Sequence, residues 1–500
     1  MSRLVISICF ALMPLVIFAT DVRSAVKPVT GTWINLAYQD VRNKYTNPLY
    51  VDTTDPSLWE HKILELSAMG MEYLVFMAVA NEGKAYYPSK LMPLAYSAHK
   101  KSPVDVIMDT AARLGMKVFM STGWANNQDD NLRDFRIKQR QLDMMEELAS
   151  LYGGHEALYG WYLPVEDCLC PILSDYAVSA VNTLTAQARS LTPDKKILIS
   201  PYGIFNSAFE NPNYERQLAR LNVDIIAYQV EVGCVRENYP LVNLRKNWEK
   251  LRDIHNRLNI QLWANCETFT WEGNTNDRNS ALVPAAYPRL LSQQTIASML
   301  GVDAIISFMF CGIIENPCSV YQLGQPFWSN YVYNDYMSWR SGDRYWKLLE
   351  YSFMNALNNG LDISSVKCDG RFSALFDGAL AVESVQDKHW VKLDEGYHEL
   401  VVEIPATVTL HEMFIRMFHD NNRRILPPRK ICLYASTNGV DYDLLSVKDV
   451  VRFANSKHDS WIEGVWFGNM DSSVRFLKIA FYADEKVYID EWYVNPEYKI

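Results

Sequence analysis

Short apolar segments alternate with longer helical ones between residues 30 and 310. The apolar segments are nearly uninterrupted, which is typical of parallel strands buried on both faces. The helical segments begin with signals such as Asp55-Pro56 and Ser102-Pro103 and end at glycines such as Gly70 and Gly115. The expected strands are residues 33–38, 73–79, 117–121, 158–163, 196–200, 224–229, 261–264 and 304–310.

Eight alternating strand and helix units over roughly 300 residues predict the α/β class and a closed (β/α)8 barrel, the TIM barrel. An open, doubly wound sheet is the alternative arrangement of the same units. Such a sheet would be expected to carry a G-x-G-x-x-G or phosphate-binding loop, and neither motif occurs. We therefore expect the barrel, in which reactive side chains stand at the C-terminal ends of the strands.

The pattern changes after the eighth expected strand. Residues 327–357 are aromatic, have helical spacing, and are expected to close the barrel. From about Ser364 onward, short alternating segments follow one another without helices, and Asn438-Gly439 forms a turn signal. This favours an antiparallel β-sandwich. Its expected strands are residues 390–393, 399–404, 413–417, 430–434, 476–481 and 487–494. We expect a catalytic barrel domain over residues 25–360 and the sandwich over residues 361–500.

Residues 1–24 have the features of a secretory signal peptide. Arg3 precedes an apolar run from Leu4 to Ala19, and Val22-Arg23-Ser24 forms a small-residue cleavage site. The alternative is an uncleaved anchor, for which the run is short. No apolar run of membrane-spanning length follows, so we expect no transmembrane segment in the mature chain. The expected location is periplasmic or extracellular.

Charge and cysteine content exclude several classes of function. The chain has 48 Lys and Arg against 58 Asp and Glu, a net charge of −10, and no dense basic block, which disfavours nucleic acid as a partner. Cys168-x-Cys170 lacks a second ligand pair at zinc spacing, and no H-E-x-x-H occurs, so we expect no catalytic metal. No obligate protein partner is inferred. One or two disulfides are expected to brace the barrel rim among Cys168, Cys170, Cys234, Cys266, Cys311 and Cys318.

Two carboxylates follow expected strands four and seven. Glu166 ends the segment Tyr159 to Glu166, and Glu267 ends the segment Gln261 to Glu267. Cleavage of a glycosidic bond needs such a pair, one carboxylic acid to protonate the leaving oxygen and one carboxylate to attack or to activate water. The alternative is that each glutamate caps a helix or pairs with an arginine. The pair therefore requires both side chains to face one cavity about 5 Å across. Side chains that point into separate regions, or a buried guanidinium that binds either glutamate, would overturn the proposal.

The segment Gly160-Trp161-Tyr162-Leu163-Pro164-x-Glu166, together with Tyr86-Tyr87-Pro88-Ser89 and Gly115-Met116-Lys117-Val118-Phe119, resembles an exported bacterial family of glycosidase-like barrels. That family is similar to the clan A retaining glycoside hydrolases, and the resemblance covers about residues 28–345. It implies that Glu166 is the general acid/base and Glu267 the nucleophile. The chain has Val165 where clan A enzymes usually have Asn, and Phe308 and Phe310 where they often have Trp. Glu231, two residues after the sixth expected strand, is a spare carboxylate that could replace Glu267 in the pair.

Polar and aromatic side chains after the other expected strands are candidates for substrate binding. Aromatic faces and fixed polar groups bind sugars, although each aromatic residue could equally pack in the core. The candidates are Asn35, Asn81, Trp124, Asn126, Tyr202, Tyr228, Gln229, Glu231 and Trp271.

The C-terminal region resembles a discoidin module of the coagulation factor 5/8 type. The resemblance rests on Ile425-Leu426-Pro427-Pro428-Arg429-Lys430, on Leu433 to Gly439, on Arg475 to Ile479, and on Ile489-Asp490-Glu491. It implies a glycan-binding module with a possible structural Ca2+, and a spacer that packs on the barrel is the alternative. The sequence as a whole predicts an exported retaining glycoside hydrolase, and a non-catalytic glycan-binding protein is the alternative function.

Overall fold

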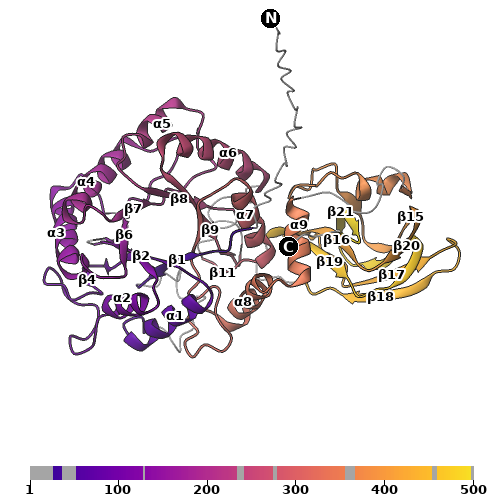
Figure 1. Cartoon of the computed structure of the whole chain (residues 1–500), viewed down its shortest axis with the longest axis horizontal. Helices are drawn as coiled ribbons and strands as arrows, with labels where there is room; N and C mark the ends of the chain where they lie inside the picture. The colour runs from indigo at the N-terminus through magenta and orange to yellow at the C-terminus, as the bar shows by residue number, and fades with distance from the viewer. Residues whose placement is uncertain are drawn as a thin grey trace, which may run out of the picture.

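The computed structural model describes residues 26–36, 52–124, 126–127, 130–232, 241–273, 279–354, 366–452 and 459–496. These residues form two units, a barrel and a pair of antiparallel sheets beside it (Figure 1). The predicted signal peptide and the predicted boundary between residues 360 and 361 lie outside the described residues.

The first unit is a closed barrel of eight parallel strands, counted over the described residues. All eight lie at predicted positions, and their order around the barrel is β1-β12-β9-β8-β7-β6-β5-β2, which confirms the (β/α)8 prediction. The strand that carries the second candidate carboxylate is longer than predicted and includes Glu267 as its last residue. The strands are β1 (Gly31–Asn35), β2 (Tyr73–Ala78), β5 (Lys117–Ser121), β6 (Leu158–Tyr162), β7 (Lys196–Ile199), β8 (Ile225–Val230), β9 (Gln261–Glu267) and β12 (Ala304–Phe308).

Helices follow the strands and cover the outside of the barrel (Figure 1). Several begin at a polar residue whose side chain accepts a hydrogen bond from the first turn, as Asp55 does from Ser57 and Ser102 from Asp105, with proline next in sequence. The helices are α1 (Pro56–Ala68), α2 (Pro103–Arg113), α3 (Phe135–Tyr152), α4 (Asp175–Leu191), α5 (Pro212–Leu218), α6 (Leu241–Leu258) and α7 (Tyr287–Met299), and then α8 (Pro326–Arg340) and α9 (Arg344–Met354) in the predicted aromatic segment. Short hairpins β3 (Ala80–Asn81) with β4 (Lys84–Ala85) and β10 (Phe269–Trp271) with β11 (Leu282–Pro284) follow β2 and β9.

Aromatic rings fill the barrel near the starts of its strands. Tyr73 of β2 lies 4.9 Å from Trp263 of β9, and Phe119 of β5 lies 5.9 Å from the same indole, measured between ring centroids. Because β5 and β9 are not neighbours in the sheet, this contact crosses the interior. The barrel is therefore packed at this level, and a ligand can enter only nearer the C-terminal ends of the strands.

The second unit is a β-sandwich of two antiparallel sheets with an apolar core between them, as predicted. Three of its strands were not predicted, namely β13 (Lys367–Cys368), β18 (Asp443–Asp449) and β19 (Ser460–Phe467). Of these, β18 carries mostly exposed side chains and so lacks a buried apolar pattern. One sheet contains β13 (Lys367–Cys368), β15 (Gly396–Leu410), β20 (Ser472–Ala483), β17 (Lys430–Ser436) and β18 (Asp443–Asp449). The other contains β14 (Val391–Leu393), β21 (Val487–Val494), β16 (Met413–Asp420) and β19 (Ser460–Phe467).

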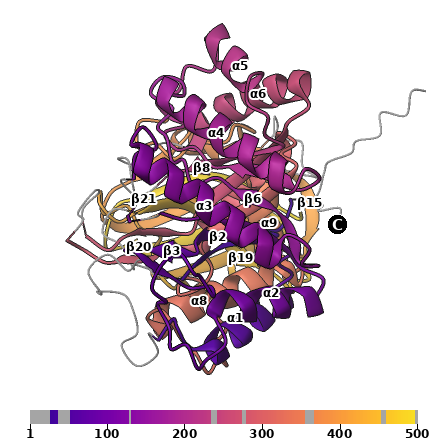
Figure 2. The same cartoon turned by 90° about the vertical axis from the view of Figure 1, so that its left-hand side faces the viewer.

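The sandwich packs against the barrel through α7 and α9 (Figure 1). Seen from the barrel side, the sandwich lies behind the barrel (Figure 2). Phe414, Trp461 and Tyr493 of the sandwich belong to the same apolar cluster as the barrel core. Arg344 of α9 donates from Nε to Glu412 at 3.1 Å at the edge of this contact. The two units therefore share buried surface, which brings sandwich side chains next to α7.

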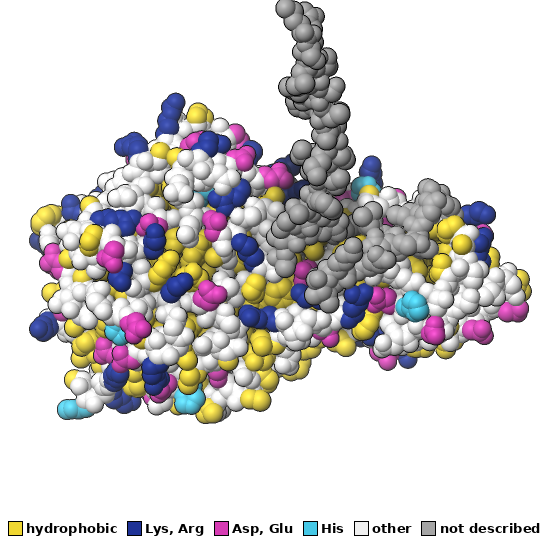
Figure 3. Space-filling model, in the orientation of Figure 1, with side chains coloured by type: hydrophobic (Ala, Val, Ile, Leu, Met, Phe, Trp, Pro, Cys, Tyr) yellow, Lys and Arg dark blue, Asp and Glu magenta, His cyan; other side chains and the backbone are white. Residues whose placement is uncertain are grey.

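The surface seen in Figure 3 mixes acidic and basic side chains without a continuous block of either sign. Within the described residues, no helix combines the length and the apolar character that a membrane crossing requires.

Candidate active site

The C-terminal ends of the barrel strands surround a cavity of about 190 Å3 that contains both predicted carboxylates. Glu267 ends β9, and Glu166 lies in the loop that follows β6. Glu231, just after β8, opens onto the same cavity. Its lining residues are Trp33, Met77, Trp124, Tyr162, Glu166, Gln229, Val230, Glu231, Asn265, Glu267, Phe269 and Phe308.

A second cavity of about 570 Å3 continues from the first toward the loops after β5, β6 and β7. The two cavities share Trp124, Glu166, Gln229 and Glu231, so they form one cleft with a smaller and a larger part. The larger part is also lined by Asp130, Asn131, Asp167, Tyr176 and Tyr202, among others. Glu166 is exposed where the two parts meet, whereas Glu267 is only 7% exposed and Glu231 only 3%.

Glu166 is held by the amide of Gln229. Nε2 of Gln229 donates to Oε1 of Glu166 at 2.9 Å and to the carbonyl oxygen of Ser200 at 3.0 Å. Gln229 was predicted to bind substrate, and it lines both parts of the cleft. Its amide therefore fixes the direction of the exposed carboxylate.

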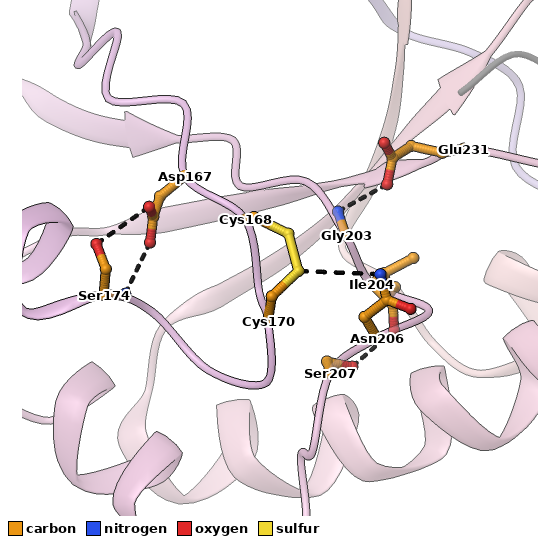
Figure 4. Close-up of a disulfide and its surroundings, with 9 residues drawn as sticks. All are labelled: Asp167, Cys168, Cys170, Ser174, Gly203, Ile204, Asn206, Ser207 and Glu231. Atoms are coloured by element: carbon orange, nitrogen blue, oxygen red, sulfur yellow. Dashed lines mark hydrogen bonds between the residues drawn. A yellow bond between two sulfur atoms is a disulfide. The ribbon is translucent and has the colours of Figure 1, made fainter. Parts of the chain in front are cut away.

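The loop that carries Glu166 is tied down immediately after this residue (Figure 4). Asp167 accepts hydrogen bonds from the backbone N–H of Ser174 at 2.8 Å and from its hydroxyl at 3.1 Å. Cys168 and Cys170 form a disulfide, which agrees with the prediction of a bridge at the rim. The bridge closes a turn within one loop, while Cys266, Cys311 and Cys318 are free and Cys234 lies outside the described residues.

Glu231 anchors the neighbouring loop. Its Oε2 accepts a hydrogen bond from the backbone N–H of Gly203 at 2.6 Å (Figure 4). Gly203 has a φ of +81°, and a Cβ atom at this position would lie 2.8 Å from Sγ of Cys168. Glycine is therefore required here, and Glu231 links the loop after β7 to the end of β8.

Glu267 lies beside a buried guanidinium. Nη2 of Arg289, on α7, is 3.4 Å from Oε1 of Glu267, and the arginine is only 2% exposed. This is the contact that the sequence prediction treated as an objection. The distance is longer than the ~2.7–2.9 Å of a strong charge-assisted hydrogen bond. Nη2 therefore forms a long ion pair with Glu267 and also donates to the backbone carbonyls of Glu267 at 3.2 Å and Phe269 at 2.7 Å. Glu267 is still one of the residues that line the cavity.

Tyr228 is a correction to the predicted site. It was expected to contact substrate, but its side chain is fully buried, and its hydroxyl lies 2.6 Å from that of Tyr214 and 3.0 Å from Nε2 of His255. Burial lowers the pKa of His255 to about 4, so this cluster is neutral. Successive strand side chains point to opposite faces, so when Gln229 faces the cleft, Tyr228 faces the helices.

Other predicted binding residues lie outside the lining of the two cavities. Asn126 bonds Asp130 through its backbone N–H at 2.8 Å and its side chain at 3.0 Å. Asn35 ends β1 and is 3% exposed, Asn81 lies in the β3–β4 hairpin, and Trp271 is buried at the end of β10. Of the predicted binding residues, the cavities bring together Trp124, Tyr202, Gln229 and Glu231.

Several lining residues were not predicted. Trp33, Tyr162, Asn265 and Phe269 face the smaller part of the cleft, and the rings of Trp33 and Tyr162 meet edge to face at 4.5 Å. Trp33 and Tyr162 lie within strands, where a cleft-lining aromatic residue cannot be distinguished by type from a core residue. Their position near the strand ends was the available signal.

The predicted calcium site can be compared with a group of carboxylates in the sandwich. Burial and the neighbouring Asp490 and Asp377 raise the pKa of Glu491 to about 10. Oδ1 of Asp490 and Oε2 of Glu491 are buried without a hydrogen-bond partner among the described residues. Oxygen ligands of this kind suit Ca2+. However, the described residues contain no cluster of three or more ligand side chains placed to hold a metal ion, so backbone or water oxygens would have to complete a site.

Comparisons with known proteins place the barrel in a family. No curated protein sequence matches the chain. Similar solved structures include a Bacteroides thetaiotaomicron protein provisionally named an alpha-L-fucosidase, with a TM-score of 0.49 and 16% identity over 63% of this chain and 96% of that one. A Ruminococcus gnavus GH29 fucosidase in complex with fucose has a TM-score of 0.36 and 9% identity over 95% and 93%. A GH2 beta-galacturonidase from Eisenbergiella tayi bound to galacturonate has a TM-score of 0.40 and 13% identity over 63% and 51%.

A model of the family described as a domain of unknown function, DUF4434, matches residues 29–321, which include every strand of the barrel. This match spans more than half of the sequence, and the chain therefore belongs to the DUF4434 family.

Proposed function

We propose that the chain is an exported glycoside hydrolase that cleaves O-glycosidic bonds of a glycan by a two-step retaining mechanism. The observation that carries the proposal is the cavity onto which both carboxylates open, Glu166 from the loop after β6 and Glu267 from the end of β9. These two strands are not neighbours in the barrel. Two carboxyl groups on either side of one bond are what glycoside cleavage requires. Export rests on the predicted signal peptide, and glycan binding by the sandwich rests on its resemblance to discoidin modules.

We assign the roles of Glu166 and Glu267 from the solvent exposure of each side chain. Glu166, exposed between the two parts of the cleft, protonates the leaving oxygen while the bond between this oxygen and the anomeric carbon breaks. Glu267, almost out of solvent and beside Arg289, attacks the anomeric carbon and forms an ester. Glu166 then takes a proton from water, which attacks the same carbon and releases Glu267.

The shape of the cleft indicates where each part of the substrate lies. The smaller part falls below the ~300–1,000 Å3 typical of pockets for drug-sized ligands, which suits a single sugar ring. Trp33, Trp124 and Phe308 supply aromatic walls for it. The larger part, on the other side of Glu166, has room for the leaving group.

The test is a screen of aryl glycosides and polysaccharides, with the configuration of the first product followed by NMR. Retention is expected, and inversion would contradict the mechanism. Glu166→Gln and Glu267→Gln should each abolish turnover while glycan binding persists. Glu82→Gln is the matched control, because Glu82 is an exposed carboxylate near β3 that does not line either cavity. If the wild-type protein binds glycan but cleaves no substrate in the screen, the alternative function, a non-catalytic glycan-binding protein, is favoured.

Azide separates the two roles. In Glu267→Ala, azide can replace the missing nucleophile and should give a glycosyl azide of inverted configuration. In Glu166→Ala, azide attacks the glycosyl-enzyme and should give the retained configuration. The same product configuration from both variants would show that the roles are misassigned, and the Glu231→Ala variant then tests the spare carboxylate.

A further inference from the structure

The sandwich places a buried carboxylate behind Glu267. Asp459 precedes β19, is 2% exposed, and accepts a hydrogen bond on Oδ1 from Nη1 of Arg289 at 3.3 Å. Nη2 of the same guanidinium lies 3.4 Å from Oε1 of Glu267. A side chain of the second unit thus reaches the candidate active site through one arginine.

Arg289 is fixed at the end of β9 by more than these two carboxylates. Its Nη2 donates to the carbonyl oxygens of Glu267 and Phe269. Gln293, one turn further along α7 and fully buried, donates to the same Glu267 carbonyl at 3.2 Å. The position of the guanidinium is therefore coupled to the backbone that carries the candidate nucleophile.

We propose that Asp459 is a positioning residue for Glu267, acting through Arg289, so that the sandwich completes the active site of the barrel. The inference rests on the proposed function, in which Glu267 is the nucleophile. Without a second carboxylate, the guanidinium would turn fully toward Glu267 and close to charge-assisted hydrogen-bond distance, ~2.7–2.9 Å. Asp459 shares the positive charge of Arg289 with Glu267, so that the Glu267 carboxylate stays directed at the cavity.

The charged groups around Glu267 determine the direction of the expected pH effect. Arg289 of α7 faces it, Glu166 and Glu231 share its cavity, and Asp459 lies beyond the guanidinium with His419 close to it. Cys266 stays neutral because burial raises its pKa to about 12. Burial raises the pKa of Asp459, although Arg289 opposes this shift. Asp459→Asn keeps the size of the side chain and removes one negative charge at every pH at which Asp459 is ionised. Arg289 then acts on Glu267 alone, which should make Glu267 ionise at lower pH.

The first measurement does not depend on activity. A carbodiimide with glycinamide labels protonated carboxyl groups, and mass spectrometry of the peptide containing Glu267 gives the pH of half-labelling. Asp459→Asn should lower this pH by at least about half a unit. The control is Glu403→Gln, at a carboxylate of the sandwich that pairs with Arg475 and, within the described part of the chain, does not contact Arg289 or the candidate calcium ligands. This control should leave the Glu267 curve unchanged.

The second measurement uses the aryl glycoside that the screen identifies as substrate. Asp459→Asn should lower kcat about tenfold with KM within twofold, and move the acid limb of kcat to lower pH. Superimposable wild-type and Asp459→Asn curves, or an equal shift in Glu403→Gln, would overturn the inference. If Asp459→Asn does not fold, Arg289→Lys replaces it, because lysine cannot contact both carboxylates. Arg289→Lys should lower kcat and raise the half-labelling pH, and unchanged values would also overturn the inference.

The two proposals can fail separately. Full turnover by Glu267→Gln would remove Glu267 as nucleophile, while the labelling curve would still measure its coupling to Asp459. Loss of turnover in Glu267→Gln together with an unchanged labelling curve in Asp459→Asn would keep the function and remove the positioning role.

Discussion

Gln229 orients the exposed carboxylate of Glu166 through a hydrogen bond. Its amide bridges Oε1 of Glu166 and the carbonyl oxygen of Ser200 at the end of β7. In the proposed mechanism Glu166 is the proton donor. A donor on a loop loses rate when it samples other rotamers, because the transferred proton must start within hydrogen-bond distance of the leaving oxygen. The amide should therefore affect kcat more than substrate affinity.

Gln229→Leu tests this role with a side chain of similar volume. A hydrogen bond to a charged group contributes about 1.5–3 kcal/mol, so kcat should fall about 10- to 100-fold while the melting temperature changes little. Gln187→Leu is the matched control, because Gln187 donates to Glu146 at 3.0 Å on the outer helices. Equal kcat values for the two variants would remove the orienting role of Gln229.

At the residue scale, strand position in the sequence indicated which carboxylates line the cavity, whereas the direction in which a strand side chain points could not be predicted for Tyr228. Glu166 and Glu267 were selected because each follows or ends an apolar strand segment, and both line the same cavity. Tyr228 was misassigned because it was taken with its neighbour Gln229, although adjacent strand residues face opposite ways. Arg289 was not identified because it lies within a helix, and its partner Asp459 is 170 residues away in another unit.

At the scale of elements, the loops after β6, β7 and β8 form one connected rim. Leu169 donates its N–H to the carbonyl oxygen of Tyr202 at 2.8 Å, and Gly203 donates to Glu231. Such cross-loop bonds position Glu166 without a helix or strand beneath it. They depend on close packing of Gly203 against the Cys168–Cys170 turn.

Gly203→Ala should therefore lower the free energy of unfolding by more than the backbone strain of an alanine at positive φ would by itself. Both Gly203 and Gly342 have positive φ, at +81° and +85°, but a Cβ atom at Gly342 meets nothing within 4 Å. Gly342→Ala should cost about 1 kcal/mol, and Gly203→Ala about 2–4 kcal/mol because Cys168 must also move. Thermal unfolding measures both variants. Equal losses would mean that the rim absorbs the added methyl group without displacement.

The strand that carries Asp490 and Glu491 gives a pH prediction. The pKa of Glu491 is about 10 in the folded protein against an ordinary value of 4.5. The unfolded chain therefore loses this proton first, and stability should fall as pH rises from about 4.5 toward 10. Glu491→Gln removes this dependence and should raise the melting temperature at pH 8, in chelator, by about 3 °C or more. Glu395→Gln, at an exposed position, is the control.

Calcium gives the complementary measurement on the same strand. If Ca2+ binds at Asp490 and Glu491, adding it at pH 8 should raise the wild-type melting temperature and leave Glu491→Gln nearly unchanged. An equal rise in both proteins would place any bound calcium elsewhere.

Element prediction worked best where burial was two-sided. The barrel strands read as apolar runs because the interior covers one face and the helices the other. β18 (Asp443–Asp449) was not predicted because its side chains are mostly exposed, so its sequence does not alternate between apolar and polar residues. The length of β9 was also underestimated, because Asn265 and Glu267 are polar but buried within the site.

For the whole molecule, the distribution of charge indicates which glycans the cleft would accept under the proposed function. Asp130, Glu166, Asp167, Glu231 and Glu267 line it, and none of its described lining residues is Lys or Arg. The net charge of −10 has the same sign. A sugar that carries a carboxylate would have to approach several like charges in a partly desolvated space, which is unfavourable.

Neutral glycosides should therefore be better substrates than the corresponding uronides. For the aryl glycoside that the screen identifies, the analogue with a carboxylate at C6 should have a kcat/KM at least about 100-fold lower. Because the penalty is electrostatic and includes exposed charges, added salt should narrow the difference. The neutral C6-methyl ester of the same uronide controls for size, and it should recover most of the rate. A uronide that is cleaved faster than its ester would show that cationic groups reach the bound sugar.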